Sequence, residues 1–575
     1  MASITHARIA FLSGDEALAQ GAYEEGLKVA ASYPGTPASE ILEYLSRLPQ
    51  VDSQWSVNEK VAYEVALAAS IAGVRALFSA KHVGLNVAMD SLMTSAYTGV
   101  GAGFLVVSAD DPGIHSSQNE QDNRLLARIA NIPLLEPCSP SEAKAFVKIG
   151  FSISERFDTP VMIRLTTRIA HTKENIVLGK RQEVPRREFK IDIAKYVMVP
   201  RNAAARHLQL QERLARLRRY SAVVPINSIE LKDRKIGFIT AGVSYLYAKE
   251  NYPEASFLKL GLSYPFPEDK AREFCRKVKQ VYVIEELEPF LEDEVRKLGL
   301  KCKSKHPTFS VGELRPEYIP LIIKNKAKPQ EASATRKPQL CPGCPHRQVF
   351  WVLKKLKLVV TGDIGCYTLG ALPPLGSLHS CLCMGAAVTF LEGFKRGGVK
   401  NTVAVIGDST FVHAGITGLI NLAYNKTNGV VIIVDNATTA MTGNQPHPAT
   451  GVTIKGELTK KLILEDLCKS CGADKVDVID PYQVKELEAL LRQRTGEDAL
   501  SVIISRHPCR LIERGRKAMP VYKKELCKAC GLCLTINCPA IEKREDGTIQ
   551  IQDVACTGCN LCVEVCAFGA LIRCE

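Results

Sequence analysis

Residues 402–437 have the sequence TVAVIGDSTFVHAGITGLINLAYNKTNGVVIIVDNA, and this stretch decides the fold class of the second half of the chain. Two apolar runs, TVAVIG and GVVIIV, have the length of buried strands and predict neighbouring strands of a parallel sheet. The first run leads into Gly407-Asp408-Ser409 and the second into Asp435-Asn436. Asp408 and Asn436 are therefore expected at the carboxyl ends of strands, where open α/β sheets bind ligands.

The chemistry of these side chains suits a magnesium diphosphate. An Asp carboxylate, an Asn amide oxygen and a backbone carbonyl, with diphosphate oxygens and a water, form the octahedral oxygen set that Mg²⁺ demands. Gly407 would let the backbone approach the diphosphate, and the helix after Ser409 would direct its N–H groups at it. Taken alone, GDS followed by DN is also what unrelated strand-end turns produce.

The remaining sequence predicts further domains. A chain of 575 residues is too long for one core and should divide into about four domains. Before residue 175, short apolar runs such as GFLVVSAD alternate with helical stretches, which predicts a parallel sheet with helices on both faces. A basic segment then predicts a connecting arm with a solvated or subunit-facing helix. The expected parts are a first α/β domain (1–174), the arm (175–234), a small α/β domain (235–325), a linker (326–340), a second α/β domain (341–515) and a C-terminal domain (516–575).

Composition is that of an ordinary globular protein, with 46% hydrophobic and 23% charged residues. No signal-peptide pattern opens the sequence and no stretch approaches about 18 uninterrupted apolar residues, so we expect a cytoplasmic protein without a membrane partner. The formal net charge of +13 suits anionic cofactors and an acidic protein partner. Because no nucleic-acid-binding motif accompanies this charge, we expect no nucleic-acid partner.

Eight cysteines near the C-terminus fall into two quartets that each begin C-x2-C-x2-C. This spacing is typical of [4Fe–4S] ligation, and in two-cluster ferredoxins the fourth cysteine of each run serves the other cluster. The alternative is two structural zinc sites, which the repeated two-residue gaps fit less well. We therefore expect an α+β ferredoxin-like domain with one cluster at Cys527, Cys530, Cys533 and Cys566 and a second at Cys538, Cys556, Cys559 and Cys562.

Longer motifs carry a family resemblance. After Asn436 the chain continues through TTAMTGNQPHP, with CPGCPHR and GDIGCYTLG upstream. In these stretches it resembles the thiamine-diphosphate subunit of the 2-oxoacid:ferredoxin oxidoreductases and, within them, the α subunit of the indolepyruvate branch. The first domain resembles the same family in YPGTPASE, NEKVAYEVALAAS, KHVGLNVAMD and DDPGIHSSQNEQDNR. The resemblance implies two doubly wound thiamine-diphosphate-type domains, for the pyrimidine and the diphosphate, with a transketolase-C-like domain between them and the two-cluster tail at the end.

The resemblance also implies residues that bind the cofactor. Asp408 and Asn436 become the Mg²⁺ ligands, with the Thr438 carbonyl as a third. Gly407 and Ser409 would touch the diphosphate. Met441 either wedges beneath the thiazolium or is an ordinary core methionine.

Glu59 matches the glutamate that protonates N1′ of the aminopyrimidine, which lets the cofactor remove its own C2 proton. Glu64 is the nearby alternative, and either could be a helix-surface carboxylate. Thr36, His82 and His115 are candidates for holding the substrate carboxylate and the developing enolate, although a buried histidine satisfied by the backbone is the commoner case.

A third cluster is a further implication. In related oxidoreductases, cysteines at CxGC, in the GIGC turn and after the last strand hold a cluster close to the cofactor. The matching residues in this chain are Cys341, Cys344, Cys366 and Cys509. The indolepyruvate branch, however, is usually described with the two tail clusters only, so both two and three clusters stay open.

The activity implied is oxidative decarboxylation of aryl-2-oxoacids such as indolepyruvate with coenzyme A, giving aryl-acetyl-CoA, CO₂ and reduced ferredoxin. It would require thiamine diphosphate, Mg²⁺ and the clusters, together with a smaller β subunit carrying the γ-type domain, in an α2β2 heterotetramer. The alternatives are an oxidoreductase for pyruvate or 2-oxoglutarate, a thiamine-dependent decarboxylase and a non-enzymatic iron–sulfur electron carrier. The intact GDS, DN and NEK motifs argue against the carrier, which would not need Mg²⁺ and N1′ ligands.

Overall fold

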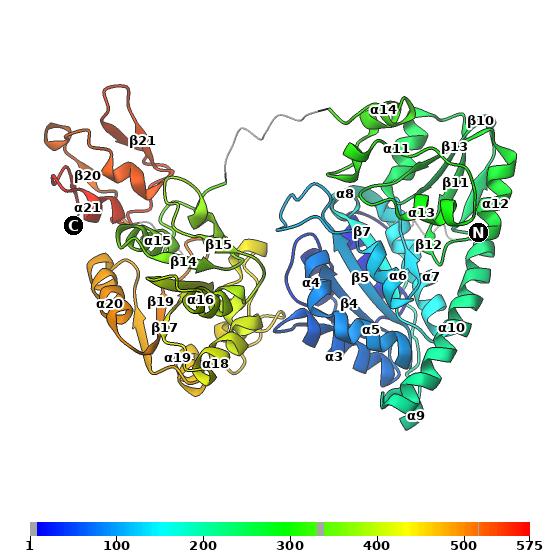
Figure 1. Cartoon of the computed structure of the whole chain (residues 1–575), viewed down its shortest axis with the longest axis horizontal. Coiled ribbons are helices and arrows are strands. Elements are labelled where there is room, and N and C mark those ends of the chain that lie inside the picture. The colour runs from blue at the N-terminus through cyan, green and yellow to red at the C-terminus, as the bar shows by residue number, and fades with distance from the viewer. Residues whose placement is uncertain (1–7, 330–337, 514, 516, 575) are drawn as a thin grey trace, which may run out of the picture. The chain divides into compact units, whose positions relative to one another are not determined.

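The computed structural model of the chain describes residues 8–329, 338–513, 515 and 517–574. It divides into two units, Met1–Glu331 and Ala332–Glu575. Both are α/β, as expected, with parallel sheets and packed helices (Figure 1). Within the described ranges no helix has both the length and the apolar character needed to cross a lipid bilayer. Most of the expected linker, residues 330–337, lies outside the described residues.

A seven-stranded sheet forms the centre of the first unit. The strand order is β12 (Leu262–Tyr264), β6 (Leu134–Leu135), β7 (Val161–Thr166), β5 (Phe104–Asp110), β4 (Ala76–Lys81), β2 (Val29–Ser32) and β3 (Asp52–Trp55). Strand β12 is antiparallel to β6, and every other neighbouring pair is parallel. Every residue of β5 and β7 is buried. That burial explains why these strands are nearly continuous apolar runs.

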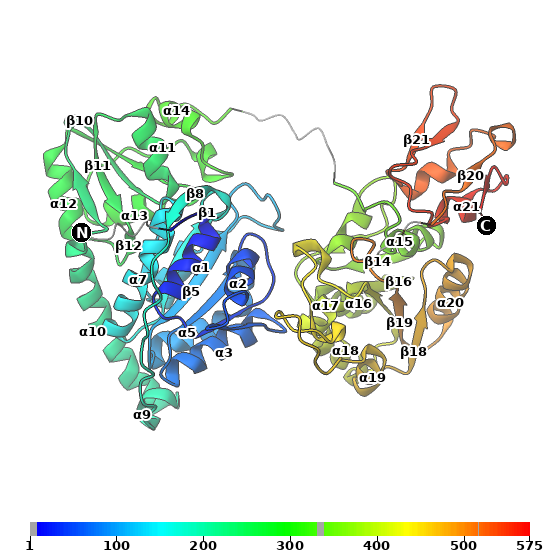
Figure 2. The ribbon, with the colours of Figure 1, turned by 180° about the vertical axis from the view of Figure 1, so that it is seen from behind.

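Helices cover this sheet on both sides. They are α1 (Gly14–Glu24), α2 (Ser39–Ser46), α3 (Glu59–Ile71), α4 (His82–Val87), α5 (Met89–Thr98), α6 (Arg124–Ala130), α7 (Pro140–Phe157) and α8 (Thr167–His171). Helices α4 and α5 lie in front of the sheet in Figure 1, and α1 lies in front of it in Figure 2. The capping box at Ser13 and Glu16 starts α1, and the side chain of Asn58 caps α3.

A smaller sheet completes the first unit. Its order is β13 (Gln280–Ile284), β10 (Asp233–Ala241), β11 (Ala255–Leu260) and β9 (Ser228–Glu230), with β9 antiparallel to β11. Around it lie α11 (Val243–Asn251), α12 (Glu268–Lys277), α13 (Phe290–Lys297), α14 (Ile319–Ile323) and the short helices η1 (Pro307–Ser310) and η2 (Pro316–Tyr318).

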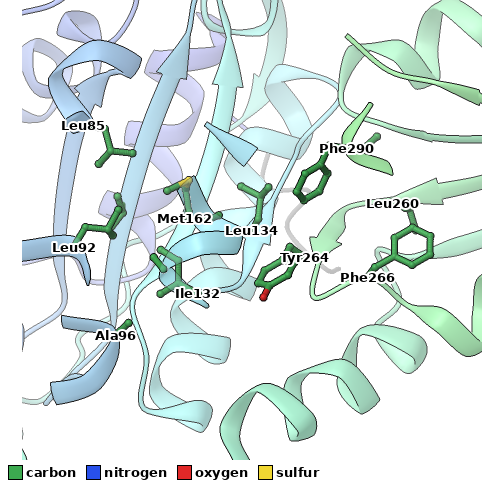
Figure 3. Packing of buried hydrophobic residues seen from close by; sticks show 14 of the residues in the cluster. Leu85, Leu92, Ala96, Ile132, Leu134, Met162, Leu260, Tyr264, Phe266 and Phe290 are labelled. Carbon is green, nitrogen blue, oxygen red and sulfur yellow. The ribbon is translucent and has the colours of Figure 1, made fainter. Parts of the chain in front are cut away.

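The two sheets of this unit share one core. Strand β12 comes from the segment expected to form a separate domain, yet it pairs with β6 of the first sheet. In Figure 3, Leu134 and Met162 of the first sheet lie in the same buried cluster as Tyr264 and Phe290. Residues 235–325 therefore pack continuously onto the first domain.

The basic arm contains β8 (Lys173–Val177), which pairs antiparallel with β1 (Ile9–Ser13), then α9 (Ile193–Tyr196) and α10 (Pro200–Val223). One face of α10 is buried, with Arg206 and Arg213 among its residues. Arg206 donates to the Tyr97 and Thr98 carbonyls, and Arg213 donates to that of Ala96. The expectation of a solvated or subunit-facing helix is therefore wrong for this face, because its arginines satisfy the last carbonyls of α5.

The second unit is built on a six-stranded, fully parallel sheet. Its order is β15 (Ser380–Cys381), β14 (Val359–Gly362), β16 (Thr402–Gly407), β17 (Gly429–Asp435), β19 (Leu500–Arg506) and β18 (Lys475–Ile479). The register pairs Gly407 with Val434. Asp408 and Asn436 consequently leave neighbouring strands at the same edge of the sheet, as the sequence predicts.

The helices of this sheet are α15 (His346–Lys355), η3 (Cys366–Ala371), α16 (Ala386–Arg396), α17 (Asp408–Thr410), the π-helical η4 (Phe411–Gly415), α18 (Ile416–Tyr424), η5 (Ala440–Thr442), η6 (Pro448–Thr450), α19 (Leu464–Ser470) and α20 (Val484–Gly496).

The C-terminal segment packs against this sheet domain within the same unit. Its elements are β20 (Val521–Tyr522) paired with β23 (Leu571–Ile572), β21 (Ile541–Lys543) paired with β22 (Ile549–Ile551), and the helices η7 (Lys524–Leu526), η8 (Leu532–Ile536) and α21 (Leu561–Val565). Ile536 and Leu561 of this segment belong to the same buried cluster as Val349 and Leu353 of α15.

Candidate functional site

Asp408 is the centre of a buried polar network at the end of β16. Its side chain is almost fully buried, and its carboxylate accepts hydrogen bonds from the Ser409 and Ala437 backbone N–H groups, both at 2.9 Å. His447 Nε2 lies 3.2 Å from the same carboxylate. Burial opposes ionisation of Asp408, but the hydrogen bond and charge of His447 outweigh it and hold the pKa below its usual value. Asp408 is therefore an ionised carboxylate that is fixed in place by its hydrogen bonds.

Asn436 lies beside it, at the end of β17. Its amide oxygen accepts from the Thr438 N–H at 3.3 Å, and its amide nitrogen lies 3.3 Å from His346 Nε2. Burial lowers the pKa of His346 to about 4, although the Asp408 charge opposes the shift. At neutral pH the imidazole is therefore uncharged and can accept from the Asn436 amide, which holds the amide oxygen in place.

Gly407 and Ser409 complete this edge. A β-carbon on Gly407 would lie 2.7 Å from the Tyr367 ring, so the close packing of Tyr367 requires glycine at this position. The Ser409 hydroxyl accepts from Thr439 Oγ1 at 3.1 Å. Met441 is 49% exposed, so the alternative of an ordinary core methionine is wrong.

Asp363 is a buried carboxylate at the end of β14. It accepts hydrogen bonds from the N–H groups of Ile364, Gly385 and Ala387, the last two at the start of α16. Burial raises its pKa to about 6, against the effect of these hydrogen bonds. Asp363 therefore fixes the turn before Cys366 against the amino end of α16.

The cysteines expected to hold a third cluster come together in the structure. Cys366 begins η3, and the Cys509 N–H donates to the Asn436 carbonyl at 2.9 Å. Burial, with smaller effects of the same sign from the Cys509 and Cys341 thiols, raises the pKa of Cys366 to about 11. The pKa of Cys344 is raised to about 12 by burial, with smaller effects of the same sign from Cys366 and Cys341. These mutual effects indicate that the four thiols lie in one region of the second unit, and the Cys509 backbone is bonded to Asn436 at the end of β17.

The eight tail cysteines line two cavities in the grouping that the sequence predicts. One cavity is lined by the set Cys527, Cys530, Cys533 and Cys566. The other is lined by the set Cys538, Cys556, Cys559 and Cys562. The same lining of four thiols suits the same group in both cavities.

A single metal ion finds no comparable site. Among the residues the structure describes, no three His, Cys, Asp or Glu side chains are grouped so that they could hold one ion. Each described quartet surrounds a cavity instead.

In the first unit the structure separates the two glutamates that the sequence left as alternatives. Glu59 begins α3 and is only 6% exposed, and a β-carbon on Gly84 would lie 2.4 Å from its Oε1. The Glu64 side chain is 46% exposed, forms an ion pair with Lys60 and accepts from Ser91 Oγ at 2.8 Å. Glu64 is thus a surface carboxylate, whereas Glu59 is held inside against α4.

Thr36 and His82 lie in a polar region near the amino end of α4. The Ser116 hydroxyl donates to the Thr36 carbonyl at 3.4 Å, and Lys81 Nζ donates to the Ser116 carbonyl at 2.6 Å. Burial lowers the pKa of Lys81 to about 8, although Asp111 opposes the shift. His82 is fully buried, and its Nε2 lies 3.1 Å from Asn119 Oδ1.

His115 has different surroundings. Its imidazole is half exposed, and its Nε2 lies 3.9 Å from a Glu313 carboxylate oxygen. Glu313 is itself paired with Arg168, whose Nε and Nη2 donate to its two carboxylate oxygens at 2.8 and 2.7 Å, so His115 lies at the edge of an ion pair.

Sequence reasoning missed four residues of these networks: His346, Asp363, His447 and Lys81. Each lies inside a motif that carries the family resemblance, in CPGCPHR, GDIGCYTLG, TTAMTGNQPHP and KHVGLNVAMD. Their position inside these motifs is the only signal in the sequence that could have identified them. The residues that they contact could be identified only in the folded structure, because each partner lies far away in the sequence.

Two family models match the chain. The model "Pyruvate flavodoxin/ferredoxin oxidoreductase, thiamine diP-bdg" matches residues 20–220, and "Thiamine pyrophosphate enzyme, C-terminal TPP binding domain" matches residues 363–505. The second range contains Asp408 and Asn436, and the first contains Glu59. The candidate residues of each unit thus lie within a matched thiamine-diphosphate domain.

Among known proteins, the chain is 38% identical to "Indolepyruvate oxidoreductase subunit IorA" of Pyrococcus horikoshii, over 97% of this chain and 96% of that protein. It is 39% identical to the protein of the same name from Archaeoglobus fulgidus, over 98% and 97%. A solved "2-oxoglutarate:ferredoxin oxidoreductase from Magnetococcus marinus with 2-oxoglutarate, coenzyme A and succinyl-CoA bound" matches 55% of this chain and 65% of that one, with 17% identity and a TM-score of 0.47. On the full-length matches, the chain belongs to the indolepyruvate oxidoreductase IorA family of thiamine-diphosphate-dependent 2-oxoacid:ferredoxin oxidoreductases.

Proposed function

We propose that the chain catalyses the oxidative decarboxylation of aryl-2-oxoacids, such as indolepyruvate, with coenzyme A. The balanced reaction is RCOCOO⁻ + HSCoA → RCOSCoA + CO₂ + H⁺ + 2e⁻, and the electrons pass to ferredoxin. One observation supports an oxidative rather than a simple decarboxylation: three sets of four cysteines occur in the same unit as the buried Asp408 and Asn436. The aryl specificity is supported by the names of the full-length relatives.

The residues at the ends of β16 and β17 suit thiamine diphosphate with Mg²⁺. Asp408 supplies an ionised carboxylate, Asn436 an oriented amide oxygen and Thr438 its carbonyl, which is the oxygen donor set that Mg²⁺ prefers. Gly407 and Ser409 would contact the diphosphate, and Met441 would lie near the thiazolium. When bound, the cofactor supplies the electron sink for cleavage of the bond to the carboxylate carbon.

In the first unit, Glu59 would hold the proton at N1′ of the aminopyrimidine. Its burial against Gly84 keeps the carboxyl away from bulk water, so that the proton can pass between this carboxyl and the cofactor. Thr36, Lys81 and His82 would orient the oxoacid. Protonated Lys81 can pair with the substrate carboxylate, and buried His82 can stabilise the enolate oxygen.

The cysteine sets would carry the electrons. Four thiols around each tail cavity fit a [4Fe–4S] cluster, and the set that contains Cys366 and Cys509 would hold a third cluster close to the diphosphate-binding edge. One-electron acceptors beside the cofactor favour oxidation over simple decarboxylation.

The proposed assembly follows from the same reaction. A smaller β subunit with a γ-type domain would complete the enzyme as an α2β2 heterotetramer, and the net charge of +13 suits an acidic ferredoxin. The chain would act in the cytoplasm, because free cysteines stay reduced in that compartment. The domain limits proposed for these roles are those expected from the sequence, with the pyrimidine-binding domain ending at 174 and the diphosphate-binding domain spanning 341–515.

An anaerobic assay tests the proposal. The chain is purified with its co-expressed small partner, supplied with thiamine diphosphate and Mg²⁺, and reduction of a low-potential viologen is followed with indolepyruvate and coenzyme A. Reduction that requires coenzyme A and is lost in Asp408→Ala is expected. Phenylpyruvate, pyruvate and 2-oxoglutarate, tested in parallel, define the substrate class. Faster turnover of pyruvate or 2-oxoglutarate refutes the aryl specificity, and no reduction by any oxoacid in the fully iron-loaded protein refutes the reaction.

A further inference from the structure

Arg347 is a buried arginine between two cysteine sets. It is the second residue of α15, and it is 1% exposed. Its Nη1 donates to the Ile536 carbonyl at 2.8 Å and also to that of Asn537, while Nη2 donates to the Cys341 carbonyl at 2.9 Å and also to that of Leu340. These carbonyls belong to Cys341 itself and to residues just before Cys341 and Cys538. The guanidinium thus links the backbone at Cys341, in one set, to the backbone just before Cys538, in the other set.

Within the residues that the structure describes, no carboxylate forms an ion pair with this side chain. All four hydrogen bonds go to neutral backbone carbonyls. Burial lowers the pKa of Arg347, and the anionic groups that oppose this shift are the thiols of Cys538, Cys344, Cys559 and Cys341. A buried cation without an anion is costly, and arginine keeps its charge even when buried. An anion supplied by these cysteines would remove this cost.

One donor of the guanidinium is left over. Within the described part of the chain, Arg347 Nε is buried and has no hydrogen-bond partner. Arg347 also lines the cavity surrounded by Cys538, Cys556, Cys559 and Cys562. A buried, unsatisfied N–H on a residue that lines a cavity is typical of a site whose acceptor is a bound group.

The loops of the two sets are in direct contact. A β-carbon on Gly343 would lie 2.0 Å from Thr557 Oγ1, so the turn between Cys341 and Cys344 packs tightly on the loop after Cys556. The Gly343 backbone also opposes the rise that burial causes in the pKa of Cys538. Arg347 therefore lies where the two sets approach each other.

We propose that Arg347 raises the reduction potential of the cluster held by Cys538, Cys556, Cys559 and Cys562, by donating Nε–H to a cluster sulfur and by placing a fixed positive charge between this cluster and the Cys341 set. The inference rests on the proposed clusters. Reduction adds a negative charge, so a nearby cation and a hydrogen bond to sulfur stabilise the reduced form. The other tail cavity is not lined by Arg347, and its cluster serves as an internal reference.

The test is a redox titration of the full-length chain, purified with its partner and followed by EPR. Arg347→Gln removes the charge but keeps an amide that can donate to the carbonyls. At a fixed solution potential, the ratio of reduced to oxidised cluster should fall at least tenfold for one cluster. This corresponds to a reduction potential that is lower by about 59 mV for a one-electron couple. The signal of the reference cluster should not move. Arg347→Lys keeps the charge and should shift the ratio less. Arg544→Gln removes an exposed arginine from the same tail and should shift neither cluster.

A second measurement needs no variant. Wild-type protein labelled with ¹⁵N in the arginine guanidinium should show a ¹⁵N hyperfine coupling to one reduced cluster in pulsed EPR. Unchanged potentials in iron-loaded Arg347→Gln, or no ¹⁵N coupling in the wild type, would overturn the proposal. If Arg347→Gln fails to load iron, the labelled wild type decides the question alone. Wild-type protein without iron or an EPR signal would instead refute the clusters, and with them the role of Arg347.

Discussion

Replacing Glu59 by Gln tests the acid–base role proposed for the first unit. Gln has nearly the same shape as Glu, so it should fit beside Gly84, but it cannot hold the proton at N1′. General acid–base catalysis contributes typically 10²–10⁴-fold. We therefore expect turnover to fall by this factor, which is about 3–5 kcal/mol in activation free energy, while thiamine diphosphate still binds.

The matched control is Glu64→Gln. Glu64 is 46% exposed and pairs with Lys60 one helical turn away, and such exposed ion pairs contribute little to stability. Its loss should leave turnover within about twofold of the wild type, because a surface carboxylate takes no part in the proton transfer. The two variants thus separate a buried carboxyl from a surface one on the same helix.

Two assays report on these variants. Single-turnover CO₂ release measures the chemical step, and hydrogen–deuterium exchange at C2 of the bound cofactor, read by NMR after acid quench, measures proton removal alone. Both rates should fall together in Glu59→Gln and stay near the wild-type values in Glu64→Gln. The proposed role of Glu59 would be refuted if Glu59→Gln exchanged the C2 proton at the wild-type rate, or if both variants lost the same factor in these rates.

Three further predictions concern other parts of the site. Asp408→Ala should weaken thiamine diphosphate binding with Mg²⁺ at least tenfold in calorimetric titration at unchanged circular dichroism, because it removes the ionised ligand; equal affinity would contradict the Mg²⁺ assignment. Because burial lowers the pKa of Lys81 to about 8, the cationic form is lost as pH rises through this value, and the KM for the oxoacid should rise about tenfold per pH unit above it. Lys81→Arg should remove this dependence, and an unaltered pH profile in that variant would exclude Lys81. The Cys341→Ser/Cys344→Ser double variant should contain about four fewer iron atoms per chain, and unchanged iron would end the third-cluster proposal.

Local sequence patterns were sufficient where the chemistry depends on neighbouring residues. The apolar runs before Asp408 and Asn436 predict parallel strands, and β16 and β17 confirm them, because a strand buried on both faces needs nothing but apolar side chains. The cysteine spacing likewise predicted which four thiols surround each tail cavity, since a C-x2-C-x2-C loop directs three thiols to one place.

Contacts between residues that are distant in the sequence could be identified only in the folded structure. The exposure of Glu64 and the burial of Glu59 were open in the sequence, and packing of α3 against α4 decided between them. Strand β12 joined the first sheet because its apolar residues complete that core, although the segment pattern predicts a separate domain. The buried face of α10 was missed because its arginines bind backbone carbonyls, which leave no mark on the sequence.

The sequence by itself determined the α/β class, the edge of the sheet that carries Asp408 and Asn436, and the grouping of the tail cysteines. Apolar runs and cysteine spacing are visible in the sequence, and the exchange of the fourth cysteine between the two runs follows a general rule of two-cluster ferredoxins. Only the tertiary structure decided that His447 holds Asp408 ionised, that His346 orients Asn436, and that Arg347 lies buried beside two cysteine sets. The physical reason is that hydrogen bonding and desolvation act through space, between side chains that the chain brings together only when it folds.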